Sequence, residues 1–170
     1  MASWKLTVED RFAIEDLYAR YAWGLDLADE DLIRSVFAED GWFDHLWQGR
    51  VQGHEAVIEN MHSLWYDRQS WWFGRQHIMN TFRFKELDGD ERGDVEVNLW
   101  FQILQYNTDY NNNFVMGIGT RTDFLTRKEG EWKFQSLHVN AWNNRDQVPW
   151  KGEITMYKRP DYKMPPQNNA

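Results

Sequence analysis

"RQHIMNTFRFKEL", residues 75–87, marks the point at which the hydrophobic period of this sequence changes. Before it, apolar residues recur at helical spacing, and from it onward apolar and polar residues alternate as in half-buried strands. The alternation continues in residues 94–106, 113–130 and 131–142, and the segments between these stretches are rich in Gly, Asn and Asp, which favour turns. We therefore expect long antiparallel strands over about residues 77–141.

Three helices are expected on the N-terminal side of this change. Residues 8–27 carry apolar side chains near 3.6-residue spacing, and Thr7 with Asp10 resembles a capping box at the start of this helix. Shorter helical patterns cover residues 30–40 and 54–65. Most of the expected helical residues therefore precede most of the expected strand residues in the sequence.

The order of elements predicts the fold class. Residues 41–53 read as a pair of short strands, and helices followed by meander strands indicate an α+β fold. We expect one domain over residues 1–145, with residues 146–170 as a C-terminal extension of that domain. A sheet this long is expected to bend around its helices.

The composition excludes several classes of protein. The net charge is −8 and no basic run is present, so we expect no nucleic-acid partner. The chain has no cysteine, no convincing metal-ligand spacing and no apolar run long enough to cross a membrane. We therefore expect a cytoplasmic protein without a metal or other cofactor.

Tryptophan is unusually abundant, with 11 residues among 170. One small core does not readily bury so many large rings, and exposed aromatic patches usually mark contacts. We therefore expect a homodimer or a homotrimer.

Four stretches resemble one known family. They are "IEDLYARYAWGLDLADEDLIRSVFAEDGWFD", "VQGHEAV", "RQHIMNTFRF" and "GEWKFQSLHV", and the resemblance covers about residues 7–141. This layout is similar to the SnoaL-like branch of the NTF2-like superfamily, which includes scytalone dehydratase and hexachlorocyclohexane dehydrochlorinase. The resemblance implies a cone-shaped α+β barrel, in which a bent, mostly antiparallel sheet wraps around three helices and a deep pocket opens at its mouth.

The resemblance also implies a catalytic pair. In those enzymes an Asp at the end of the first helix and a His on a central strand form a general base, and the matching residues here are Asp26 and His77. Tyr21 stands where the dehydrochlorinase has a lysine, and we include it as a candidate catalytic residue. An imidazole, with an ordinary pKa of about 6.5, accepts protons near neutral pH, and a carboxylate stabilises the imidazolium. Without the resemblance, His77 and Asp26 would more simply be residues of a strand start and a helix end.

Further residues are candidates for binding a substrate, because they are aromatic or because they alternate on one face of an expected strand. Asp44 and His45 face opposite sides of their strand, and the sequence leaves open which of them points into the cone. The candidate binding residues are Tyr18, Trp42, Trp72, Asn98, Trp100, His138 and Asn140.

Two functions are consistent with this pattern. The first is a cofactor-independent lyase that removes a proton from a small hydrophobic, aromatic molecule, either by dehydratase-like elimination or by carbon–carbon cleavage such as deformylation of diaryl compounds; isomerisation is a related outcome. The second is a non-catalytic ligand-binding or assembly subunit, similar to the β subunits of ring-hydroxylating dioxygenases. Having both Asp26 and His77 favours the first function.

Overall fold

The computed structural model describes residues 6–45, 49–66, 74–107, 112–128, 130–143, 145–149 and 151. The three expected helices and the expected long strands are present. In chain order the elements are α1 (Val8–Leu27), α2 (Glu30–Val36), β1 (Phe37–His45), β2 (Gly49–Gln52), α3 (His54–Tyr66), β3 (Arg75–Glu86), β4 (Val95–Asn107), β5 (Asn112–Lys128), β6 (Glu131–Ala141) and a 3-10 turn, η1 (Arg145–Gln147).

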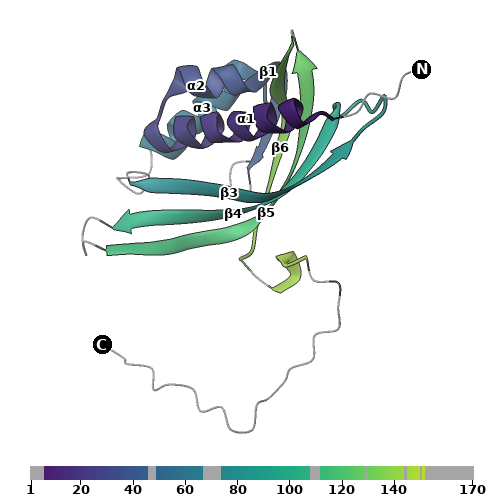
Figure 1. The fold of residues 1–170 in the computed structure, drawn as a ribbon. Helices are drawn as coiled ribbons and strands as arrows, with labels where there is room; N and C mark the ends of the chain where they lie inside the picture. The colour runs from purple at the N-terminus through teal and green to yellow at the C-terminus, as the bar shows by residue number, and fades with distance from the viewer. Residues whose placement is uncertain are drawn as a thin grey trace, which may run out of the picture.

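The six strands form one open, bent sheet in the order β2-β1-β6-β5-β4-β3. β1 runs parallel to β6, and every other neighbouring pair is antiparallel. The three helices lie together on one side of this sheet, where the long strands curve beneath α1 (Figure 1). The expected α+β cone is therefore confirmed, although the sheet does not close into a complete barrel.

Irregular pairing lets the long strands bend. The β3–β4 register shifts between Asn80 and Arg83, where Thr81 has a φ of 56°. Further shifts occur between β4 and β5 and between β5 and β6. Such bulges increase local twist and bend a strand, so they let the sheet curve toward the helices.

The core lies between the helices and the inner face of the sheet. On β4, Val97, Leu99 and Phe101 are buried while the intervening Trp100 is 55% exposed, so this strand shows the expected alternation. One boundary differs from expectation: the second helix ends at Val36 and not near residue 40, because Phe37 pairs with Phe134 and starts β1.

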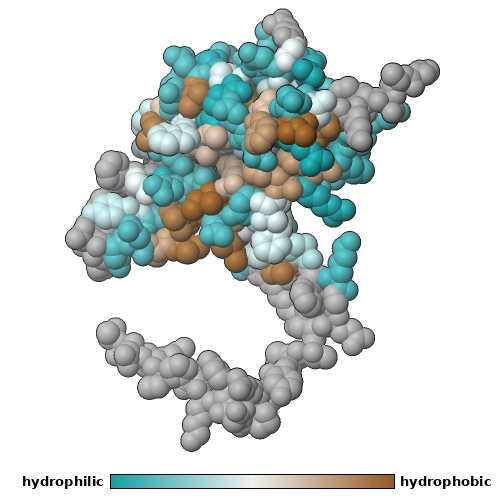
Figure 2. Space-filling view, viewed as in Figure 1, coloured by the Kyte–Doolittle hydropathy of each residue, from teal (hydrophilic) through white to brown (hydrophobic). Residues whose placement is uncertain are grey.

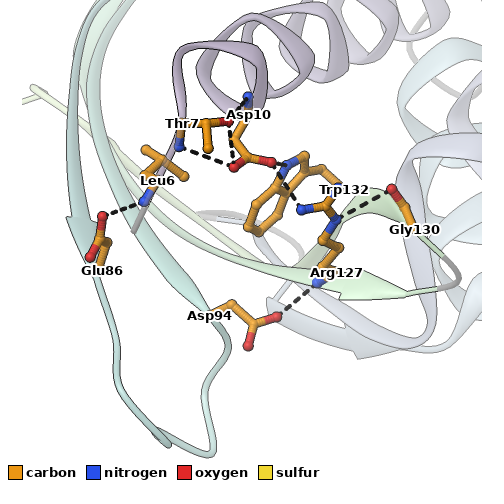
Figure 3. A network of polar contacts seen from close by, with 8 residues as sticks. All are labelled: Leu6, Thr7, Asp10, Glu86, Asp94, Arg127, Gly130 and Trp132. Atoms are coloured by element: carbon orange, nitrogen blue, oxygen red, sulfur yellow. Dashed lines mark hydrogen bonds and ion pairs between the residues drawn. The ribbon is translucent and has the colours of Figure 1, made fainter. Parts of the chain in front are cut away.

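Hydrogen bonds join the start of α1 to the end of β5 and the start of β6 (Figure 3). Thr7 and Asp10 form the expected capping box, and Asp10 Oδ1 also accepts hydrogen bonds from Trp132 Nε1 and Arg127 Nη1, both at 3.1 Å. Burial alone would raise the pKa of Asp10, but the hydrogen bonds from Thr7 and Trp132 and the charge of Arg127 outweigh it and lower that pKa. Asp10 therefore joins the helix cap to β5 and β6.

No helix in the described part of the chain is both long enough and apolar enough to span a membrane.

Candidate active site

Asp26 and His77 meet where the last turn of α1 crosses the start of β3. Asp26 Oδ1 lies 2.5 Å from His77 Nδ1, and Asp26 Oδ2 accepts the backbone N–H of His77 at 2.7 Å. The two side chains are only 14% and 10% exposed, respectively. One carboxylate therefore holds both the ring and the backbone of the histidine.

The surrounding helices fix Asp26 in this position. α1 ends directly after it, and Ala28 closes the helix in the left-handed conformation with its N–H donating to the carbonyl of Gly24. From α3, Trp65 Nε1 donates to the carbonyl of Leu25 at 2.8 Å. These bonds satisfy carbonyl groups at the helix end and tie it to α3, so the carboxylate is held by rigid elements.

The contact determines which nitrogen of the imidazole is basic. When the ring is neutral and Nδ1–H donates to Asp26, the basic lone pair resides on Nε2. The carboxylate also stabilises the positive charge that forms when Nε2 takes up a proton. In this arrangement His77 can act as a general base, and the Asp26 carboxylate orients its ring.

Both residues line a cavity of about 850 Å³. It is formed by the C-terminal turns of α1 and α3, the start of β3 and the end of β4. Its wall is largely aromatic or apolar and includes Trp23, Leu27, Trp65, Tyr66 and Tyr106. Such a site accommodates a small hydrophobic molecule next to His77.

Arg75 also lines this cavity, and the sequence analysis did not identify it. It is 5% exposed, and its Nε donates to Gln105 Oε1 at 3.0 Å. Arg75 precedes His77 by two residues on the same strand, so the two side chains share a face. That spacing was the signal in the sequence that could have revealed it.

Tyr21 and Tyr18 lie in the core beneath the site and do not line the cavity. Each is 2% exposed, and Tyr18 donates its hydroxyl to Asp123 Oδ2 at 2.8 Å. Tyr21 packs on Phe134, and its hydroxyl interacts with the buried guanidinium of Arg121. Burial raises the pKa of Tyr21 to about 12, although Arg121 opposes that rise.

Most of the other expected binding residues lie on the outer face of the sheet, away from the cavity. Trp42 contacts Arg50 and His138, Asn98 bonds to Thr122, and Asn140 bonds to Thr120 and to the carbonyl of Gln147. The expectation that they share faces was correct, but the cavity opens elsewhere. The residues concerned are Trp42, Asn98, Trp100, His138 and Asn140. Trp72 falls outside the described residues.

His138 occupies a different setting from His77. Its Nδ1 lies 3.8 Å from Asp44 Oδ2, and its ring meets Trp42 edge-on at 4.4 Å. Burial lowers the pKa of His138, and Asp44 only partly offsets this effect. Asp44 therefore points to the outer face, while the neighbouring His45 packs beside the buried Phe43.

Within the described ranges, no group of three or more His, Cys, Asp or Glu side chains is arranged to hold a metal ion.

The sequence model of the SnoaL-like domain matches residues 6–138 of this chain. The chain belongs to the SnoaL-like domain family. No curated protein sequence matches this SnoaL-like chain.

Solved structures agree with that assignment at the level of the fold. A cystatin-like protein of unknown function from Nostoc punctiforme PCC 73102 has a TM-score of 0.67 and 19% identity, covering 81% of this chain and 95% of its own. The protein Aln2 from a Streptomyces species has a TM-score of 0.65 and 17% identity, covering 79% and 93%. Hexachlorocyclohexane dehydrochlorinase LinA-type3 from Novosphingobium barchaimii LL02 has a TM-score of 0.62 and 22% identity, covering 79% and 87%. At these identities the similarity establishes the fold alone.

Proposed function

We propose that this SnoaL-like protein is a cofactor-independent lyase that acts on a small hydrophobic, aromatic molecule. The observation that carries the proposal is the Asp26–His77 contact in the wall of a largely aromatic cavity. A histidine oriented by a carboxylate inside a partly closed cavity is suited to removing a proton from carbon.

In the proposed reaction, His77 Nε2 takes a proton from a carbon of the substrate. The electron pair of that C–H bond becomes the new double bond as the bond to the leaving group on the adjacent carbon breaks. Asp26 stabilises the imidazolium, which then returns its proton to the leaving group or to water. In the carbon–carbon variant, His77 would instead take the proton of a substrate hydroxyl, and the electron pair of that O–H bond would form the C=O bond of an aldehyde as the adjacent C–C bond breaks. The electron pair of the broken C–C bond would become a new C=C bond as a hydroxyl leaves the next carbon, and the imidazolium would return its proton to that hydroxyl as water departs.

A similar protein supports elimination as the reaction type, because one structural neighbour is named a hexachlorocyclohexane dehydrochlorinase. The aromatic wall of the cavity supports an aromatic substrate, since Trp and Tyr rings stack on other rings. Tyr21 does not contact the cavity because its ring lies in the core, so we propose for it only an indirect role as a positioning residue, through its electrostatic interaction with Asp26.

The test begins with a substrate search, in which the purified protein is incubated with aromatic alcohols, halides and diaryl diols and the products are followed by mass spectrometry. On the substrate found, His77→Ala should lower kcat about 10²–10⁴-fold because the base is lost. Asp26→Asn should have a comparable effect because the imidazolium loses its counter-charge.

Two control variants distinguish the loss of these catalytic groups from a general loss of stability. Asp16→Asn makes the same change on an exposed part of α1, and His138→Ala removes a histidine of the outer face. Both should retain activity. Wild-type turnover in folded His77→Ala and Asp26→Asn would refute the proposal.

The alternative is a non-catalytic ligand-binding or assembly subunit, and one observation favours it. The outer face of the sheet exposes Ile78, Trp100, Val115 and Ile118, and Figure 2 shows hydrophobic side chains gathered over the strands at the lower left. Such a patch is typical of a protein contact. A stable complex with a different chain, together with no turnover of any candidate substrate, would favour this function.

A further inference from the structure

The cavity has a closed end and an open end. Asp26 and His77 are nearly buried at the closed end. Trp23, Leu27 and Tyr66 also line the cavity, yet they are 66%, 66% and 65% exposed, respectively. These three side chains therefore form the open end, and they present large apolar surfaces that a bound molecule can cover.

The last turns of α1 lead from the base toward the open end. At about 100° per residue, Trp23 and Leu27 lie about 60° and 100° around the helix from Asp26, on the same side of it. All three side chains line the same cavity. A molecule that meets His77 beside Asp26 can therefore continue over Trp23 and Leu27.

α3 supplies a second ring at the open end. Trp65 Nε1 donates to the carbonyl of Leu25 at 2.8 Å, and this bond joins the end of α3 to the end of α1. Tyr66 follows directly, and its ring lies 6.1 Å from that of Trp65 and 5.6 Å from that of His62. Tyr66 is thus held near the end of α1, where Trp23 lines the same cavity. We call Trp23 and Tyr66 the rim rings.

The volume of the cavity exceeds what one aromatic ring requires. It is about 850 Å³, whereas a cavity of about 150 Å³ in a protein core is enough to bind benzene. A substrate with one ring at His77 would therefore leave most of the cavity to water. A second ring on the same molecule would displace that water and cover the rim rings, and burying apolar surface in this way is favourable.

We infer that Trp23 and Tyr66 determine specificity by holding a second aromatic ring, so that the cavity takes an elongated molecule of two linked rings. The reacting carbon of that molecule lies at His77. This inference rests on the proposed function for the identity of the reacting end, but it concerns binding and not turnover. A role of the rim rings as a contact for another protein chain predicts instead that their removal leaves ligand preference unchanged.

The experiment compares two probes that differ by one ring, 4-methylphenol and 4-benzylphenol, by isothermal titration calorimetry. Wild-type protein should bind 4-benzylphenol at least about tenfold more tightly, which corresponds to about 1.4 kcal/mol. Replacing both rim rings, Trp23→Ala with Tyr66→Ala, should weaken 4-benzylphenol binding at least about tenfold, because the second ring loses its contacts. The affinity for 4-methylphenol should change less than about twofold, because the closed end is intact.

Two matched controls test whether the rings at these positions cause the effect. Phe12→Ala removes a similarly exposed ring of α1 that lies outside the cavity, so both affinities should stay at their wild-type values. Tyr66→Phe keeps the ring and removes only the hydroxyl, so the preference for two rings should remain. If the double variant does not fold, Trp23→Ala and Tyr66→Ala should each still weaken 4-benzylphenol binding at least about threefold.

Three results would overturn the inference: no saturable binding of 4-benzylphenol to wild-type protein, an unchanged preference in the folded double variant, or an equal loss of affinity for both probes. His77→Ala separates this inference from the proposed function, because it should lose turnover and keep the preference for two rings. Wild-type turnover in folded His77→Ala would contradict the proposed function alone.

Discussion

Replacing Asp123 by Asn should destabilise this protein far more than its small change in shape implies. Asp123 is fully buried under α1, where its Oδ2 accepts the hydroxyl of Tyr18 at 2.8 Å and its Oδ1 accepts the backbone N–H of His138 at 3.0 Å. Arg121, which is 3% exposed, places its Nη2 2.8 Å from Asp123 Oδ2. The Asn variant would keep much of the shape but leave a buried guanidinium without its counter-charge.

The magnitude follows from that burial. Breaking a buried ion pair by removing one partner costs about 3–5 kcal/mol. At about 2–4 °C per kcal/mol for a domain of this size, the melting temperature should fall by about 6–20 °C. Asp44→Asn is the matched control, because the Asp44–Arg50 pair is 38% and 60% exposed and such pairs contribute about 0–1 kcal/mol.

The assays are urea unfolding, which gives the free energy of unfolding, and thermal unfolding, which gives the melting temperature. Both are followed by tryptophan fluorescence, which the 11 tryptophans make sensitive. The double variant Arg121→Met with Asp123→Leu should be clearly more stable than Asp123→Asn, because it removes both charges from the core. If Asp123→Asn is no less stable than Asp44→Asn, then Asp123 does not provide the counter-charge that Arg121 requires in the core.

Two further predictions concern the helix cap and the outer face. Because the pKa of Asp10 is lowered in the folded state, its contribution is complete above its ordinary pKa of about 3.9 and is lost as the pH falls through the lower, folded-state value. Asp10→Asn should therefore be about 1–3 kcal/mol less stable at pH 7, and urea titrations should show that the difference shrinks below about pH 4; a constant difference would contradict this. Light scattering should show a dimer or a trimer, and Trp100→Glu should weaken it; a wild-type monomer at high concentration would remove the prediction.

The helices and long strands were predictable because their periods are local properties of the chain. The capping box at Thr7 and Asp10 determines where α1 starts, and both residues can be read without a structure. The early end of α2 was not predictable, because it depends on Phe37 pairing with Phe134, nearly a hundred residues away.

The pairing of Asp26 with His77 and the existence of a pocket were predictable only through resemblance, whereas the residues that line the pocket were not predictable. Alternation on β4 shows that Trp100 and Phe101 face opposite sides, but both faces carry large rings, so the pattern does not identify the inner one. The cavity is also assembled from the ends of α1, α3, β3 and β4, and no segment carries its pattern alone. Arg75 was missed because a single arginine at a strand start resembles an ordinary surface charge.

Among the strands that the structure describes, β3 lies at one end of the sheet, and Asp26 covers only one backbone N–H of its outer edge, that of His77. An edge strand of this length is a template onto which another chain can add, and many β proteins aggregate by that route. Here the bulge at Thr81 interrupts the edge, and the exposed Arg83 and Lys85 follow it directly. The bulge and these two charges therefore disfavour the addition of another strand to β3. Substitutions in residues 81–85 should consequently lower solubility even where they leave the cavity unchanged.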